Sequence, residues 1–342
     1  MRVNHGPSLG RALKTVPAVL VAAVLLLAGC SGGSPDAPQA AGSGRAWTAP
    51  RTMPAGMGSG AADGVFPRTV KHFSGTTALP AAPKRVVVIS TGQADALLTL
   101  GVVPVGSTRG DGAELVPRYL LAAFPEAAKV ADVGSRVAPD LETIGNLKPD
   151  LVVMNTAGKD AAALYTSLSA IAPTVATQGT GLYWKQDFLL LADALGKTQQ
   201  AQHLLDAYHA DAAALGASLH PAPAVSFLRK NADRLRIFGV PSFTGSIAED
   251  AGLARPRDQQ FGQTSQDISN EELDRADGDW IFYGVQGGPA KAATLTSAPL
   301  WPTLTAVAAK TAIPVDDDVF YLNTGPTAAR EVLEALQHAL RR

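Results

Sequence analysis

Two segments of the chain follow one template, and this repeat constrains the fold more than any other feature. In each copy a glutamate is followed two places later by an apolar residue and eight places later by an aspartate that opens an apolar run. The copies run from Glu142 to Asp150 and from Glu271 to Asp279. Each predicts a short helix with its glutamate near the positive N-terminal end, followed by a buried strand. The repeat indicates two similar lobes, although two unrelated helix caps would give the same pattern.

Short apolar runs and helically spaced segments alternate on both sides of the repeat. This alternation predicts an α/β protein with parallel sheet covered by helices. The predicted strands are residues 85–90, 102–106, 129–133, 151–155 and 173–177, then 224–228, 234–238 and 280–283. The predicted helices outside the repeat include residues 94–100, 161–171 and 326–340.

A long helical segment separates the two halves. Residues 187–195 have helical spacing up to Gly196, and residues 198–219 carry apolar side chains close to a 3.6-residue period. Thr198 is the predicted N-cap, and a helix over 198–219 would be about 33 Å long. A long surface helix would show the same pattern, but its central position favours a strut. We therefore expect two Rossmann-like α/β lobes, residues 67–182 and 221–342, joined by interlobe helices within residues 183–220.

The N-terminus has the pattern of an export signal. Three basic residues precede the short apolar stretch 16–28, which is too short to span a bilayer as a permanent helix. The stretch ends in Leu-Ala-Gly before Cys30, which resembles the lipobox of bacterial lipoproteins, where that thiol receives a lipid. An ordinary signal with an incidental cysteine is the alternative. Residues 1–29 are thus a predicted lipoprotein signal peptide. Residues 30–66, rich in Gly, Pro, Ser and Ala, are a predicted flexible tether.

Composition excludes several classes of protein. Cys30 is the only cysteine, so the chain has no internal disulfide and no cysteine-based metal site. Removal of residues 1–29 would take away three basic residues and leave 26 basic against 30 acidic residues. This slight acidity, without a basic cluster, argues against nucleic-acid binding. Roughly 275 residues follow the predicted tether, enough for one large or two medium-sized cores.

The chain from about residue 70 onward resembles the iron–siderophore substrate-binding lipoproteins of ABC importers. The segments that carry the resemblance are residues 83–98, 100–106, 133–153, 168–175, 245–252 and 299–301. It implies a class III periplasmic-binding-protein-like fold and a monomeric, extracytoplasmic receptor, lipid-anchored through Cys30 to the outer face of the bacterial cytoplasmic membrane. Such a receptor binds a ferric siderophore and delivers it to an ABC permease dimer. Iron is carried within the siderophore, so no cofactor or metal is expected on the protein itself. A strut of this kind also implies little movement of the lobes on binding.

The resemblance gives the two repeated glutamates a role. In the family, one acidic residue on each lobe meets arginines on the two copies of the permease, and Glu142 and Glu271 occupy the matching positions. Two separated carboxylates suit a symmetric pair of guanidinium pockets, where they would set orientation and encounter rate more than affinity. Glu272 adjoins the second position, so the register there stays open.

Ligand contacts are expected on loops that face the cleft between the lobes. The metal-bound oxygens of a ferric siderophore carry negative charge, which suits arginine and the donors of tyrosine and tryptophan. Arg136 and Tyr321 match ligand contacts in hydroxamate-binding relatives, and a surface ion pair is the alternative for Arg136. Loop placement adds Arg109, Tyr183, Trp184, Arg229 and Tyr283. Two family aromatics are missing, at position 319 and in the loop 155–159, which leaves the ligand's identity open.

Two other functions are weighed against this prediction. An exported α/β hydrolase would need a nucleophile and base, but the chain has no Gly-x-Ser-x-Gly, phosphate-binding or His-Glu-x-x-His motif, so we expect no enzyme activity. A haem or corrinoid (vitamin B12) receptor of the same fold is the second alternative. Haem calls for an axial ligand, for which Tyr119, Tyr183, Tyr283 and Tyr321 are candidates. The acidic run 316–318 predicts a solvated turn, not a metal site.

Overall fold

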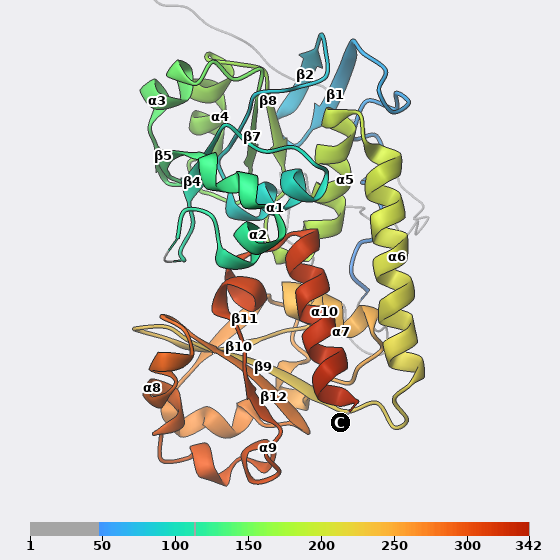
Figure 1. Ribbon diagram of the computed structural model, residues 1–342. Helices are drawn as coiled ribbons and strands as arrows, with labels where there is room; N and C mark the ends of the chain where they lie inside the picture. The colour runs from blue at the N-terminus through green and yellow to red at the C-terminus, as the bar shows by residue number, and fades with distance from the viewer. Residues whose placement is uncertain (1–47, 113, 342) are drawn as a thin grey trace, which may run out of the picture. The chain divides into compact units, whose positions relative to one another are not determined.

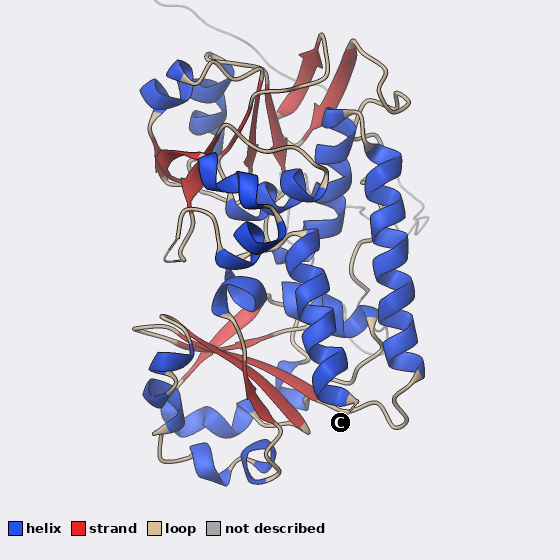
Figure 2. Ribbon diagram, viewed as in Figure 1, coloured by secondary structure: helices blue, strands red, loops and turns tan. Residues whose placement is uncertain are grey.

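Two main β-sheets, each with its own helices, form the body of the protein (Figures 1 and 2). The computed structural model describes residues 48–112 and 114–341, all of which fall within one unit, residues 42–342. The predicted signal peptide, Cys30 and the first part of the predicted tether lie outside the described residues. In the described part of the chain, no helix is both long and apolar enough to cross a membrane.

The first sheet has six strands in the order β6-β5-β4-β3-β7-β8. All neighbours in this sheet are parallel except β5 and β6, which form an antiparallel pair. Its strands are β3 (Val86–Val88), β4 (Gly106–Arg109), β5 (Ala131–Ser135), β6 (Ala138–Pro139), β7 (Leu151–Asn155) and β8 (Thr174–Thr177). Its helices are α1 (Thr91–Thr99), α2 (Arg118–Ala123), η1 (Pro125–Lys129), α3 (Leu141–Asn146) and α4 (Ala161–Ser169). A separate hairpin precedes them, β1 (Arg68–His72) and β2 (Gly75–Leu79).

The second sheet has five strands in the order β11-β10-β9-β12-β13. Its strands are β9 (Val225–Lys230), β10 (Leu235–Phe238), β11 (Ser265–Ile268), β12 (Trp280–Val285) and β13 (Ala312–Pro314). Strands β9, β12 and β13 are parallel, as expected, but β10 and β11 are antiparallel to their neighbours. The reason is local, because only four residues connect β9 to β10 and a parallel crossover needs a dozen or more.

Shorter elements and two longer helices, α7 and α10, complete the second half. They are α7 (Phe243–Asp250), η3 (Arg257–Gln259), η4 (Asn270–Ala276), η5 (Pro289–Lys291), α8 (Ala293–Thr296), η6 (Trp301–Thr303), α9 (Thr305–Ala308), η7 (Asp318–Leu322) and α10 (Pro326–Leu340). Between the two sheets come η2 (Gly181–Tyr183), α5 (Trp184–Leu195) and α6 (Thr198–Ala217). The acidic run 316–318 leads into η7, which begins at Asp318. Asp316 is exposed, as predicted for a solvated turn, but Asp317 is buried and held by an arginine of β9.

The sequence repeat occupies equivalent places in the two sheets. Glu142 lies in the first turn of α3, which leads into β7, and Glu271 lies in the first turn of η4, which leads into β12. The repeated aspartates bond backbone amides that precede the neighbouring parallel strand. Asp150 accepts from the amides of Lys84 and Arg85 before β3, and Asp279 accepts from the amide of Ala224 before β9. The repeated aspartate thus aligns the starts of two paired strands in each sheet.

A continuous apolar core runs from one sheet to the other through the interlobe helices. Every residue of α5 except Gln186 is buried, and its leucines share one cluster with Val86 of the first sheet and Phe227 of the second. Figure 1 shows α6, in yellow, running beside α5 and α10. The predicted long interlobe helix is therefore confirmed over residues 198–217, and α5 and α10 pack beside it.

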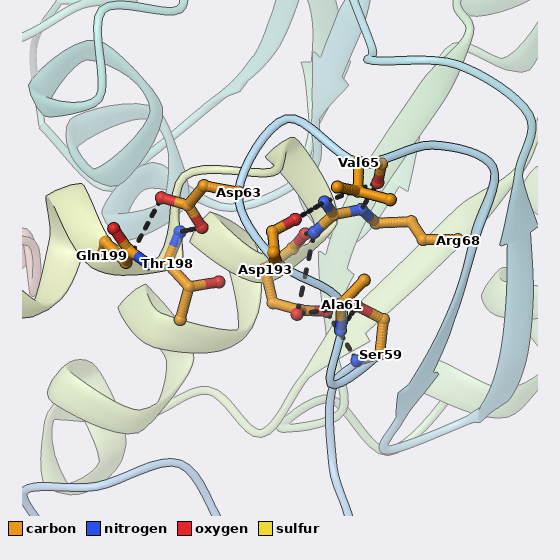
Figure 3. Close-up of polar contacts among 9 residues, drawn as sticks. Ser59, Ala61, Asp63, Val65, Arg68, Asp193, Thr198 and Gln199 are labelled. Carbon is orange, nitrogen blue, oxygen red and sulfur yellow. Dashed lines mark hydrogen bonds and ion pairs between the residues drawn. The ribbon is translucent and has the colours of Figure 1, made fainter.

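The segment 48–66, which we call the N-terminal strap, packs on these helices. The Asp193 carboxylate of α5 accepts hydrogen bonds from the amide and the hydroxyl of Ser59, both at 2.8 Å (Figure 3). Asp63 accepts from the amides of Thr198 and Gln199 at 2.8 and 2.9 Å. This half of the segment for which the sequence predicted a flexible tether therefore makes specific contacts with the folded body.

The contact of Asp63 also corrects the predicted cap of α6. Lys197 occupies the N-cap position and makes no side-chain cap hydrogen bond, and Thr198 is the first helical residue. The Thr198 hydroxyl has no hydrogen-bond partner in the described part of the chain. Because the capping carboxylate comes from a residue 135 positions away, no local pattern could reveal it.

A second inter-segment cap joins the two lobes. Asp95 of α1, which is fully buried, accepts from the amides of Thr327 and Ala328 in the first turn of α10 at 2.8 and 2.9 Å. Tyr119 of α2 donates to the same carboxylate at 2.9 Å. Burial raises the pKa of Asp95, while these hydrogen bonds favour its charged form. A side chain at Gly325 would collide with this carboxylate, because a Cβ there would lie 2.3 Å from the Asp95 Cγ.

We expect Asp63→Ala to lower the free energy of unfolding by about 1 kcal/mol, the usual cost of losing a helix cap. Urea denaturation followed by circular dichroism at 222 nm, the standard helix band, would measure it. Asp258→Ala, which removes an exposed carboxylate from η3, is the matched control. Equal stability of the two variants would contradict the capping role of the N-terminal strap.

Candidate functional site

A cavity of about 620 Å³ lies at the carboxyl edge of the first sheet. Parallel strands bring their carboxyl ends to one edge, which is where open α/β sheets bind ligands. The volume falls within the range of small-molecule sites. Segments that follow β3, β4, β5, β7 and β8 line it, together with α4, α5 and the segment that leads into α10. These segments contribute, among others, Ser90, Gly110, Arg136, Asn155, Asp187 and Thr324.

Hydrogen bonds between the strand ends fix the floor of the cavity. The Asn155 amide donates to the Ser90 hydroxyl at 2.9 Å, which joins the end of β7 to the end of β3. Gln93 of α1 donates from Nε2 to the Thr177 hydroxyl at 2.9 Å and to the carbonyl of Met154. The loops that carry the lining residues are therefore held in place without a ligand.

A buried carboxylate holds the loop after β8. Asp187 of α5 accepts from the amides of Gln178 and Gly179 at 2.9 and 2.7 Å. Burial raises the pKa of Asp187 to about 7, and the backbone donors only partly oppose this shift. The group is therefore partly protonated at neutral pH.

Opposite charges meet at the mouth of the cavity. The Arg136 guanidinium lies 3.8 Å from the Asp111 carboxylate, and both side chains are more than half exposed. Lys159 and Asp160 lie side by side in the exposed loop after β7. Because a pair at this separation and exposure is weak, the Arg136 guanidinium is open to a ligand.

Two of the predicted ligand residues, Arg136 and Trp184, line the cavity. Trp184 is 3% exposed, and its indole N–H already donates to the Ser246 hydroxyl at 3.1 Å. It stacks edge-on against Tyr208 and Phe243. The Trp184 ring therefore forms part of the apolar wall of the cavity, and its indole N–H is directed to Ser246 of the second lobe.

Three other predicted ligand residues are engaged elsewhere in the protein. Tyr321 donates to the carbonyl of Phe282 at 2.6 Å, and burial raises its pKa well above the usual value. Arg229 forms a bidentate pair with Asp317 at 2.7 and 2.8 Å. Arg109 donates at 2.7 Å to the carboxylate of Asp132, a residue of β5.

The two remaining predicted contacts do not line the cavity either. Tyr283 is 8% exposed and packs edge-on against Trp301. Tyr183 ends η2, next to the lining residue Trp184. None of the described residues that line the cavity is a tyrosine or histidine, the residue types considered for a haem ligand. Among the described residues, no group of three His, Cys, Asp or Glu side chains is placed to hold a metal ion.

Sequence reasoning missed most polar residues of the cavity, among them Gln93, Lys159 and Asp187. Lys159 could have been found, because it lies in the loop after a predicted parallel strand. Gln93 and Asp187 lie in helices, where a polar side chain gives no signal of which surface it faces.

The chain matches the family of periplasmic binding proteins over residues 86–319. The probable siderophore-binding lipoprotein YfiY of Bacillus subtilis is 32% identical over 79% of this chain and 86% of its own length. The Fe(3+) dicitrate-binding periplasmic protein FecB of Escherichia coli is 25% identical over 78% of this chain and 88% of its own.

Solved structures agree with these sequence relatives. Staphylococcus aureus SirA, crystallised with staphyloferrin B, is 29% identical and superimposes with a TM-score of 0.69 over 80% of this chain and 98% of its own. A periplasmic solute binding protein of Mycobacterium smegmatis is 25% identical, with a TM-score of 0.67 over 80% of this chain and 97% of its own. The chain therefore belongs to the periplasmic binding protein family, and its two-lobed α/β fold is that of the class III members.

Proposed function

We propose that the protein is an extracytoplasmic receptor that binds a ferric siderophore in the 620 Å³ cavity and delivers it to an ABC permease dimer. The observation that carries this proposal is a preformed cavity with an available guanidinium, Arg136, at the sheet edge where α/β proteins bind ligands. The relatives that cover most of the chain include proteins named for binding siderophores and ferric citrate. Iron would arrive within the siderophore, as cargo.

The finer division of the chain is part of the same proposal. Residues up to 182 form the N-terminal lobe, residues 183–220 the interlobe helices, and residues from 221 the C-terminal lobe. The N-terminal strap supports placing the start of the folded body near residue 48 instead of residue 67. We infer that the receptor acts as a monomer held to the membrane by a lipid on Cys30.

Cys30→Ser tests the anchor directly. We expect the variant to leave the membrane fraction and enter the soluble extracytoplasmic fraction, because one thioether-linked lipid anchor would be lost. Cell fractionation and immunoblotting would measure the distribution, with Ser31→Ala as the control. Membrane retention of the Cys30→Ser variant would contradict lipidation at this residue.

Arg136→Ala tests the ligand site. Loss of a charge-assisted donor to the metal-bound oxygens is expected to raise the Kd for the bound ferric siderophore about tenfold, or about 1.4 kcal/mol. Quenching of tryptophan fluorescence measures the Kd. Arg234→Ala is a matched control, since Arg234 is also 55% exposed and lies 3.8 Å from the carboxylate of Asp267, in the second lobe. Equal Kd values for the wild type and both variants would remove Arg136 from the site.

The double variant Glu142→Ala with Glu271→Ala tests docking. Both glutamates are exposed, and neither has an ion-pair partner among residues 48–112 and 114–341. We expect uptake of radiolabelled ferric siderophore by cells to fall at least about tenfold, because both charge-assisted contacts with the permease would be lost. The Kd in solution should be unchanged.

The matched control for docking is Glu126→Ala with Glu334→Ala, which removes two exposed glutamates outside the sequence repeat. Normal uptake by the Glu142/Glu271 double variant would refute the docking role. Reduced uptake by the control pair would show that total surface charge, and not these two positions, governs transport.

A further inference from the structure

The charged residues that line the cavity carry no net positive charge. Arg136 and Lys159 are the cations, and Asp111, Asp160 and Asp187 are the carboxylates. Since burial raises the pKa of Asp187 to about 7, this residue is partly neutral at pH 7. The net charge of the lining therefore lies between zero and −1.

Arg229 and Arg109, which lie outside the lining, do not give the cavity a net positive charge. The bidentate partner of Arg229, Asp317, neutralises it, and these two side chains are only 12% and 9% exposed. Arg109 donates to one carboxylate oxygen of Asp132 at 2.7 Å, in a pair whose side chains are 62% and 35% exposed. The guanidiniums of Arg229 and Arg109 could pair with a polyanionic ligand, but both are already bound to carboxylates of the protein.

The rim of the cavity carries a further carboxylate. Asp318 of η7 lies against Gly112, where a Cβ would be 2.3 Å from its Oδ1, and Gly112 follows the lining residues Gly110 and Asp111. Burial, together with Asp316 and Asp317, raises the pKa of Asp318 to about 6. Asp318 is still mostly ionised at neutral pH, so it adds one negative charge beside the segment that carries Asp111.

A buried acceptor without a donor lies beneath the floor of the cavity. Gln93 is 5% exposed, and its Nε2 is committed to the Thr177 hydroxyl and the Met154 carbonyl, which fixes the orientation of the amide. Its Oε1 has no hydrogen-bond partner in the described part of the chain, and it is itself buried. The N–H and O–H groups of a ligand would instead meet the exposed carboxylates of Asp111 and Asp160 in the lining.

Ferric chelates of different classes differ in charge. Three hydroxamates, each singly negative, neutralise Fe³⁺, whereas three catecholates, each doubly negative, leave a trianion. A trianion that enters this cavity would lose hydration without a compensating net positive charge. A trihydroxamate chelate needs only one or two donors for its metal-bound oxygens, and its amide N–H groups or an amine tail match the acceptors of the lining.

We propose that the cavity is matched to an uncharged or cationic ferric chelate of the trihydroxamate class, and that it disfavours trianionic tris-catecholates. The metal-bound oxygens would face Arg136 and Lys159, and N–H groups of the ligand would face the lining carboxylates. This inference rests on the proposed function, since it names the class of siderophore that the same cavity takes.

Titration of the purified full-length protein with four probes tests the proposal. The probes are ferrichrome, an uncharged trihydroxamate, ferrioxamine B, its singly cationic counterpart, ferric enterobactin, a trianionic tris-catecholate, and ferric citrate. We expect the two trihydroxamates to bind at least about tenfold more tightly than the two anionic chelates. The Kd for ferrichrome should change little with added salt, because an uncharged ligand is not screened.

Charge variants separate the electrostatic cause from shape. Asp111→Asn with Asp160→Asn removes two negative charges from the lining, and should lower the ratio of the Kd for ferric enterobactin to that for ferrichrome about tenfold. Asp258→Asn with Asp274→Asn makes the same change in net charge on exposed residues of the second lobe and is the control. An equal effect of the two pairs would show that the lining carboxylates do not set the preference.

The outcomes for the two proposals differ. Tighter binding of ferric enterobactin or ferric citrate than of both trihydroxamates would overturn the inference and leave the siderophore receptor intact. Binding of none of the four probes by protein whose circular dichroism shows it to be folded would overturn the proposed function, and the inference with it.

Discussion

A buried carboxylate on α1, Asp95, is the contact on which the arrangement of the cavity depends. It caps the first turn of α10, and the segment that precedes α10 contributes Leu322, Thr324 and Gly325 to the cavity lining. The first turn of α1 contributes Gly92 and Gln93 on the same side. One carboxylate therefore sets the distance between two walls of the cavity that come from distant parts of the sequence.

Most of the fold could be predicted because it depends on local periodicity. The parallel strands β3, β7, β9 and β12 lie where β-branched and aromatic runs indicated them, and α6 follows its apolar period. Predictions failed where a distant residue decided the outcome. The cap of α6 comes from Asp63 and not from Thr198. The prediction of parallel sheet was also wrong for β10, because only four residues connect it to β9.

The candidate site was predicted less completely than the fold, for a related reason. Arg136 follows β5, so its position in sequence already placed it at the carboxyl edge of the sheet. Trp184 is the first residue of α5 and forms part of the cavity wall at that edge. Arg229 and Tyr321 have the right chemistry, but partners of the second lobe hold them, and a pair such as Arg229 with Asp317 joins residues 88 positions apart. Sequence identifies side chains able to bind a ligand, and tertiary partners decide which remain available.

The inter-segment cap at Asp95 also bears on how a bound ligand could leave. Moving α10 away from α1 would strip a fully buried carboxylate of two backbone donors, and the loss for a charged group exceeds about 3 kcal/mol. Spontaneous opening by that route is correspondingly rare. A partner that separated α10 from α1 would have to supply this free energy from its own binding or from a coupled reaction.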